Sequence, residues 1–220
     1  MFISSIAVYG TGQLPLTEDQ NPQPEDPYGI AKYTIELDLK NANKLFGLNY
    51  TIFRPHNVYG PHQNINDPYR NVIGIFMNKL LKEEDLPVFG DGNQKRAFTY
   101  IDDVASYIAQ SVIMEAACNE IFNIGSDEIH SINELVRVIG SVMDKNVSIQ
   151  YLPQREEVVE SFADLAKYNH IFQPYSSTSL EYGLQKMAQW VTNNFLSNES
   201  TAIAIEVEKN LPDFWKKTMS

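Results

Sequence analysis

The sequence predicts an α/β chain with a largely parallel sheet. Short apolar runs typical of buried strands alternate with longer amphipathic segments typical of helices along most of the 220 residues. Apolar residues make up 43% of the chain and charged residues 20%, a composition that supports a packed core rather than disorder. No internal repeat or low-complexity tract interrupts the alternation.

The strands are expected where short apolar runs rich in β-branched and aromatic residues end in turn residues. In chain order they are residues 2–9, 50–55, 86–90, 120–125 and 148–153. Polar loops separate the first of these strands from the helices that follow, and the loop over residues 10–25 is rich in proline, glutamine and aspartate.

The helices are expected at residues 26–46, 72–81, 102–117, 131–143 and 178–195. The first begins with a capping side chain, Asp26, and a proline at the first helical position, Pro27, and it ends before Gly47. Ser131 and Thr178 each precede a glutamate by three residues, which is the spacing of a capping box at a helix start.

The charge and cysteine content exclude several classes of protein. The formal net charge is −11, so the surface as a whole repels nucleic acid and anionic membranes, and an anionic ligand needs local cations to hold it. The single cysteine, Cys118, forms no internal disulfide and suits a reducing compartment. No apolar run approaches the ~20 residues of a membrane span, and the opening residues lack the basic start of a signal peptide. We expect a cytoplasmic protein.

The sequence lacks the glycine-rich turn that binds the pyrophosphate of a dinucleotide. That turn follows a strand, has the spacing G-x-G-x-x-G and opens a helix. Gly10 and Gly12 lead into a proline-containing loop, and Gly90 and Gly92 lead into basic residues, so neither pair completes the spacing.

Tyr28 and Lys32 form the first candidate for chemistry. They stand four positions apart, so a helix places both on one face, one turn apart. An ammonium beside a phenol favours the phenolate, which can then exchange a proton with a substrate hydroxyl. The spacing alone also fits an exposed aromatic residue beside a solvated lysine.

Ser5, in the segment SSIAVYG, stands 23 residues before Tyr28. With it the chain resembles the extended short-chain dehydrogenase/reductases, and among them the UDP-glucose 4-epimerase-like members of the NAD-dependent epimerase/dehydratase family. The resemblance implies that Ser5 is the catalytic serine, which also contacts the substrate, and Tyr28 the tyrosine base. Lys32 then also holds the nicotinamide ribose, and Tyr28 lies at the cofactor.

The segment RPHNVYGP, residues 54–61, also resembles the family. The resemblance places His56 against the nicotinamide of NAD, Asn57 at the substrate diphosphate and Asn71 at the sugar nucleotide. The alternatives are an ordinary histidine at a strand end for His56 and ordinary polar loop residues for Asn57 and Asn71.

The segments LPVFGDGNQKRAFTYIDD and YLPQREEV complete the resemblance. It implies that Pro87 and Phe89 pack the nucleotide base, that Arg96 and Arg155 clamp the diphosphate, and that Glu157 accepts a hydrogen bond from the ribose. A guanidinium fork matches phosphate oxygens and opposes the acidic field of the protein locally. A surface salt bridge is the alternative for Arg96.

The resemblance implies a two-part organisation. Residues 1–60 would be the remainder of a Rossmann-type domain, and residues 61–220 would mainly bind a nucleotide sugar, with some strands returning to the Rossmann-type sheet. The family's NAD-binding third would be absent. The expected function is therefore an NAD-dependent UDP-glucose/UDP-galactose 4-epimerase that is impaired as an isolated chain, and the alternative is a non-catalytic nucleotide-sugar-binding fragment.

Two further expectations concern chemistry and partners. Dehydratases of this fold carry an acidic pair directly after the serine position, where this chain has Ile6 and Ala7, so loss of water is disfavoured, as is decarboxylation. The helix at 26–46 has apolar residues on more than one side, which favours a homodimer through that helix.

Overall fold

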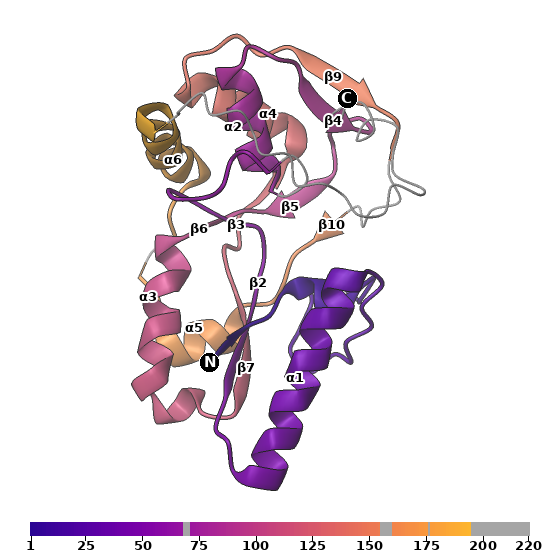
Figure 1. Ribbon diagram of the computed structural model, residues 1–220, viewed down its shortest axis with the longest axis vertical. Coiled ribbons are helices and arrows are strands. Elements are labelled where there is room, and N and C mark those ends of the chain that lie inside the picture. The colour runs from indigo at the N-terminus through magenta and orange to yellow at the C-terminus, as the bar shows by residue number, and fades with distance from the viewer. Residues whose placement is uncertain (68–70, 155–159, 176, 195–220) are drawn as a thin grey trace.

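The computed structural model describes residues 1–67, 71–154, 160–175 and 177–194. Figure 1 shows two bodies of secondary structure joined by a narrower region of short strands. The lower body holds the first helix and the central sheet, and the upper body holds three helices beside a pair of strands.

The central sheet has three parallel strands in the order β1 (Phe2–Ile3), β2 (Thr51–Pro55) and β7 (Glu120–Ile124). The middle strand β2 is buried at four of its five positions, as expected for a parallel strand that is covered on both faces. Its neighbour β7 pairs in the register Phe53↔Phe122, and the two rings stack with centroids 5.8 Å apart.

Helix α1 (Pro27–Phe46) has the boundaries that the sequence predicts. The Asp26 side chain accepts a hydrogen bond from the Gly29 N–H at 2.7 Å, and Gly47 adopts the left-handed conformation with φ 69°. Helices α3 (Asp102–Gln110) and α5 (Ala166–Phe172) form one core with the sheet, in which Phe172 contacts the ring of Phe53.

The upper body is built from α2 (Val72–Leu81), α4 (Ile132–Val142) and α6 (Leu180–Asn194). The three helices pack on the parallel pair β4 (Leu86–Phe89) and β9 (Ile149–Leu152) around a core that includes Met77, Leu135 and Leu184. Ser131 caps α4 by accepting a hydrogen bond from the Glu134 N–H at 3.1 Å, as its capping-box spacing predicts.

Short strands connect the two bodies (Figure 1). β3 (Val58–Tyr59) pairs in parallel with β6 (Thr99–Tyr100). Along the chain, β3 follows β2, and β6 precedes α3. β5 (Lys95–Ala97) lies between β8 (Ile129–Ser131), which is antiparallel to it, and β10 (Glu160–Ser161), which is parallel. The fold class predicted from the sequence is confirmed.

The prediction of a strand over residues 2–9 is wrong beyond Ile3. The chain leaves β1 and enters the 3₁₀ helix η1 (Ile6–Tyr9), and the Ser5 hydroxyl caps it by accepting a hydrogen bond from the Ala7 N–H at 3.1 Å. Serine side chains commonly bond to nearby backbone in this way, and such bonds compete with strand pairing.

Two helix boundaries also differ from the prediction. Helix α3 ends at Gln110, and two 3₁₀ turns, η2 (Ser111–Ile113) and η3 (Glu115–Ala117), replace its expected last part. Helix α6 starts at Leu180, and the side chain of Thr178 binds Asp103 at 2.6 Å instead of capping the helix.

Within the part of the chain that the structure describes, no helix is both long and apolar enough to cross a membrane.

Candidate active site

The first turn of α1 lies against the turn that follows β1. The Nζ of Lys32 donates a hydrogen bond to the Ile3 carbonyl at 2.8 Å and lies 5.7 Å from the centre of the Tyr28 ring. The Tyr28 side chain is half exposed. The structure therefore brings Tyr28 and Lys32 to the end of β1, two residues before Ser5.

Gly29 permits this close approach. A Cβ at Gly29 would lie 2.6 Å from the Ala7 carbonyl oxygen, a distance that real Cβ atoms do not adopt. Because Ala7 belongs to the turn that Ser5 caps, the absence of a side chain at Gly29 allows the Tyr28 end of the helix to pack on the Ser5 turn.

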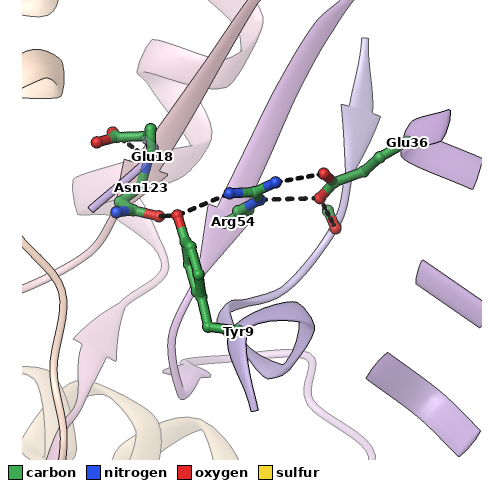
Figure 2. A network of polar contacts seen from close by, with 6 residues as sticks. Tyr9, Glu18, Glu36, Arg54 and Asn123 are labelled. Atoms are coloured by element: carbon green, nitrogen blue, oxygen red, sulfur yellow. Dashed lines mark hydrogen bonds and ion pairs between the residues drawn. The ribbon is translucent and has the colours of Figure 1, made fainter. Parts of the chain in front are cut away.

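A buried polar network connects α1 with the central sheet (Figure 2). The Arg54 guanidinium donates two hydrogen bonds to the Glu36 carboxylate, at 3.0 and 2.5 Å, and one to the Tyr9 hydroxyl at 2.7 Å. Glu36 also accepts a hydrogen bond from the Ser4 hydroxyl at 2.5 Å, and Tyr9 donates to the Asn123 side chain at 2.8 Å. Arg54 is 1% exposed and Glu36 0%, so the network joins α1, β2, η1, β7 and the residue that follows β1 inside the protein.

The charges of this network are compensated internally. Burial by itself would lower the pKa of Arg54, but the hydrogen bonds and charges of Glu36 and Tyr9 outweigh burial and raise it. Burial raises the pKa of Tyr9, although Arg54 opposes this effect. Burial also raises the pKa of Glu18, which accepts a hydrogen bond from the Asn123 N–H at 2.7 Å. The ion pair of Arg54 and Glu36 is therefore the charged centre of the network.

Two sequence signals pointed to this network and were missed. Glu36 continues the four-residue spacing of Tyr28 and Lys32 along α1, and Arg54 is a charged residue in an otherwise apolar strand pattern. A charge is rarely found fully buried unless it is paired.

His56 lies at the end of β2 and is 1% exposed. Among the described residues, neither ring nitrogen has a hydrogen-bond partner with good geometry. Burial lowers the pKa of His56 to about 4, an effect that the nearby Ala97 carbonyl partly offsets. Gly125 approaches so closely that a Cβ there would lie 2.6 Å from Nε2. The imidazole is thus a neutral, buried ring at the end of β2.

Asn57 and Asn71 bind protein backbone. The Asn57 amide donates to the Ala97 carbonyl at 2.8 Å, and the Asn71 amide donates to the Val58 carbonyl at 2.9 Å. Asn71 also caps α2 by accepting from the Ile73 N–H at 3.3 Å. Both amides hold the loops around β3 and β5, so a contact with a ligand would be in addition to these bonds or in place of them.

Three further predicted residues lie on strands of the upper body and the connecting region. Pro87 and Phe89 belong to β4, where Pro87 is buried and Phe89 partly exposed. Arg96 is partly exposed on β5, opposite His130, and its Nη1 donates to the Lys95 carbonyl at 2.8 Å. Arg155 and Glu157 lie outside the described residues.

A cavity of about 500 Å³ lies elsewhere, beside α3 and α5. Its walls include Asp102, Asp103, Asp127, Tyr107, Tyr168 and Tyr175. None of the predicted site residues that the structure describes lines this cavity. We place the candidate site at the Ser5 turn because Lys32 binds the Ile3 carbonyl just before this turn and Gly29 packs against Ala7 within it.

Comparison with known proteins identifies the family. A model of the NAD-dependent epimerase/dehydratase family matches residues 1–125, which is more than half of the chain. The chain belongs to this family. The matched residues include Ser5, Tyr28, Lys32 and the whole buried network.

Several family members with a known structure or a curated name are similar to this chain. The UDP-N-acetylglucosamine 4-epimerase of Methanobrevibacter ruminantium M1, solved with UDP-N-acetylmuramic acid, has a TM-score of 0.81 and 31% identity, over 88% of this chain and 63% of that chain. The UDP-glucose 4-epimerase of Thermotoga maritima, solved with UDP-glucose, has a TM-score of 0.78 and 34% identity, over 87% and 62%. The UDP-N-acetyl-alpha-D-glucosaminuronate decarboxylase of Bacillus cytotoxicus is 34% identical over 204 residues, which cover 86% of this chain and 62% of the relative.

The chain spans about three fifths of the length of these family members. The similar structures are largely nucleotide-sugar 4-epimerases with Rossmann-type folds. The family name supports NAD as the cofactor of the group, while this sequence has no G-x-G-x-x-G turn that opens a helix.

Proposed function

We propose that this chain carries the substrate-binding and proton-transfer residues of an NAD-dependent nucleotide-sugar epimerase that resembles UDP-glucose 4-epimerase. The observation that carries the proposal is the hydrogen bond from Lys32 to the Ile3 carbonyl, which holds the Tyr28 and Lys32 face of α1 against the strand end that leads to Ser5. In this proposal, residues 1–60 belong to the Rossmann-type domain and residues 61–220 mainly bind the nucleotide sugar.

The proposed chemistry is a proton transfer at one sugar hydroxyl. Tyr28, on the exposed first turn of α1, takes the hydroxyl proton as general base, and the Lys32 ammonium stabilises its phenolate. The Ser5 hydroxyl donates a hydrogen bond to the same sugar oxygen. Tyr28 returns the proton at the end of the reaction, so neither protein group is consumed.

The residues present fit the nicotinamide end of NAD. His56 offers two buried ring nitrogens that lack a partner, and Lys32 and Tyr28 lie on the half-exposed turn of α1. When bound, NAD would accept a hydride from the sugar carbon and return it to the opposite face. The sequence offers no comparable fit for the pyrophosphate of NAD, because the glycine-rich turn and its helix N-terminus are lacking.

The nucleotide would be held by the strands of the upper body and the connecting region. Arg96 on β5 would clamp the diphosphate, with Asn57 and Asn71 beside it, and Pro87 and Phe89 on β4 would pack the base. We propose Arg155 as a second clamp and Glu157 as a ribose acceptor on the strength of the family resemblance alone. UDP-glucose and UDP-galactose are the proposed substrate pair.

A nucleotide-sugar-binding chain without catalysis is the second candidate, because these 220 residues contain no G-x-G-x-x-G turn that would hold the pyrophosphate of NAD. Dehydration fits the site less well, because Ile6 and Ala7 follow Ser5 where an acid pair is needed. Decarboxylation stays a weaker proposal, although one similar relative carries that name.

One measurement on the purified chain separates the candidates, and a second tests whether the chain alone is a complete catalyst. Absorbance of the denatured protein reveals bound nicotinamide, which a catalytic chain retains and a binding fragment lacks. We expect little or no conversion of UDP-glucose to UDP-galactose by the isolated chain with added NAD⁺. Robust conversion that Tyr28→Phe abolishes would show that the isolated chain is a complete catalyst and is not impaired.

A further inference from the structure

Three residues of α1 share one stripe at four-residue intervals: Tyr28, Lys32 and Glu36. Lys32 and Glu36 bind two consecutive residues at the end of β1. Lys32 donates to the Ile3 carbonyl at 2.8 Å, and Glu36 accepts from the Ser4 hydroxyl at 2.5 Å. The next residue along the chain is Ser5.

Glu36 itself is held by a second element. Arg54 on β2 donates two hydrogen bonds to its carboxylate, and both side chains are buried (Figure 2). The Ser4 N–H donates to the Phe53 carbonyl at 2.7 Å, one residue before Arg54. Ser4 is thus attached to β2 through its backbone and to α1 through its side chain.

The Ser4 hydroxyl is not needed to neutralise this charge pair. Arg54 already satisfies Glu36 with two hydrogen bonds, and removing either charged partner would leave an unpaired buried charge. Removing the Ser4 hydroxyl leaves the ion pair in place and breaks only the side-chain link between α1 and the residue before Ser5. Ser4 therefore allows a positioning role to be tested apart from the stability of the fold.

We infer that Ser4 and Glu36 are positioning residues that hold the Ser5 hydroxyl in register with Tyr28 and Lys32. The inference rests on the proposed function, because it assumes that Ser5 and Tyr28 contact the sugar. Small displacements of groups that must converge on one atom weaken their joint interaction strongly. The link through Ser4 and Glu36 fixes the strand end to the helix at a point one turn beyond Lys32.

The test compares binding of UDP with binding of UDP-glucose by calorimetry, in the wild type, Ser4→Ala and Thr34→Ala. Thr34 is the control, because its hydroxyl, like that of Ser4, bonds to a residue of α1, but this bond lies within the helix and runs to the Ile30 carbonyl at 2.9 Å. We expect Ser4→Ala to weaken UDP-glucose binding about tenfold, the size of one lost hydrogen bond, and to leave UDP binding unchanged. Thr34→Ala should change neither affinity.

Equal weakening of UDP and UDP-glucose by Ser4→Ala would show a general structural role and overturn the inference, as would no change in either affinity. Failure of the folded wild type to bind UDP would contradict the proposed function instead.

Amide hydrogen exchange tests the positioning role of Ser4 without requiring that any ligand binds. The Ala7 N–H, which bonds to Ser5 Oγ, should exchange faster in Ser4→Ala while the amides of α6 do not change. Unchanged exchange at Ala7, or equal acceleration everywhere, would overturn it.

Discussion

At the scale of single residues, His56 has an environment far from that of a histidine in water. It is buried at the end of β2, neither ring nitrogen has a hydrogen-bond partner with good geometry in the described part of the chain, and its pKa is lowered to about 4 from an ordinary value of 6.5. Burial is the main cause, because it disfavours the charged imidazolium. The folded protein therefore holds this ring neutral over a pH range in which an unfolded chain protonates it.

The lowered pKa predicts acid sensitivity. Between pH 6.5 and about pH 4 the unfolded state binds more protons than the folded state, so stability is full above pH 6.5 and is lost as the pH falls. We expect the His56 contribution to the free energy of unfolding to fall by about 2 kcal/mol between pH 7 and pH 5. Urea unfolding at the two pH values should show this loss reduced in His56→Phe and retained in His170→Gln, a control at an exposed position. An identical pH dependence in the wild type and His56→Phe would contradict the assignment.

Arg96 is the residue proposed to hold the substrate diphosphate. A charge-assisted hydrogen bond contributes about 1.5–3 kcal/mol, so Arg96→Ala should weaken UDP binding by roughly 10- to 150-fold. Lys95→Ala is the control, because the exposed Lys95 precedes Arg96 on β5 and alternate strand residues point to opposite faces. Calorimetric titration of UDP checks both variants. Equal affinity in the wild type and Arg96→Ala, in samples shown to be folded, would remove Arg96 from the site.

Residue types revealed the candidate chemistry, but partners distant in sequence did not follow from them. Tyr28 and Lys32 were predictable because helix geometry places residues four apart together. The pairing of Arg54 with Glu36 depends on how α1 packs on β2, and no local spacing encodes that packing. The backbone bonds of Asn57 were likewise beyond sequence reasoning, because their acceptor lies 40 residues away.

At the scale of elements, local signals decided which boundaries could be predicted. Helix α1 has both predicted ends, since Asp26, Pro27 and Gly47 act through their immediate neighbours. The 3₁₀ helix after Ser5 was missed, because its apolar residues look like a continuing strand. The early end of α3 was also missed. There the Ser111 hydroxyl bonds back to the Ile108 carbonyl at 2.7 Å, a local bond of the kind that competes with helix continuation.

Helix α1 presents much of its apolar surface to solvent in the single chain. Its fully buried residues are Gly29 and Glu36, whereas Leu37 is 48% and Phe46 82% exposed. Apolar surface of this kind favours a partner, and we predict self-association through α1. A covering segment from a longer protein is the alternative.

Sedimentation over a range of concentrations checks the self-association. We expect the wild type to associate and Leu37→Glu to shift the protein toward monomer. Val112→Glu, at an exposed site on η2, is the control and should behave like the wild type. A wild-type monomer at every concentration would defeat the dimer proposal.

At the scale of the whole molecule, the alternation of strands and helices predicted the α/β class, but the arrangement of its parts was not predictable. The sheet order β1-β2-β7 joins segments about 50 and 70 residues apart, and two separate cores form around it and around α2, α4 and α6. Such pairings depend on long-range packing, which periodicity does not specify. The arrangement leaves the Ser5 turn in the lower body and Arg96 in the connecting region.

We propose above all that this chain holds a nucleotide sugar between Arg96 and the Ser5 turn. A crystal structure of the chain with UDP-glucose tests it most directly. We predict that the sugar hydroxyl at the inverted carbon lies within hydrogen-bond distance, about 2.6–3.2 Å, of both Tyr28 Oη and Ser5 Oγ, with the diphosphate at Arg96. UDP-glucose bound elsewhere, such as in the cavity beside α3 and α5, with the Ser5 turn empty, would contradict the account.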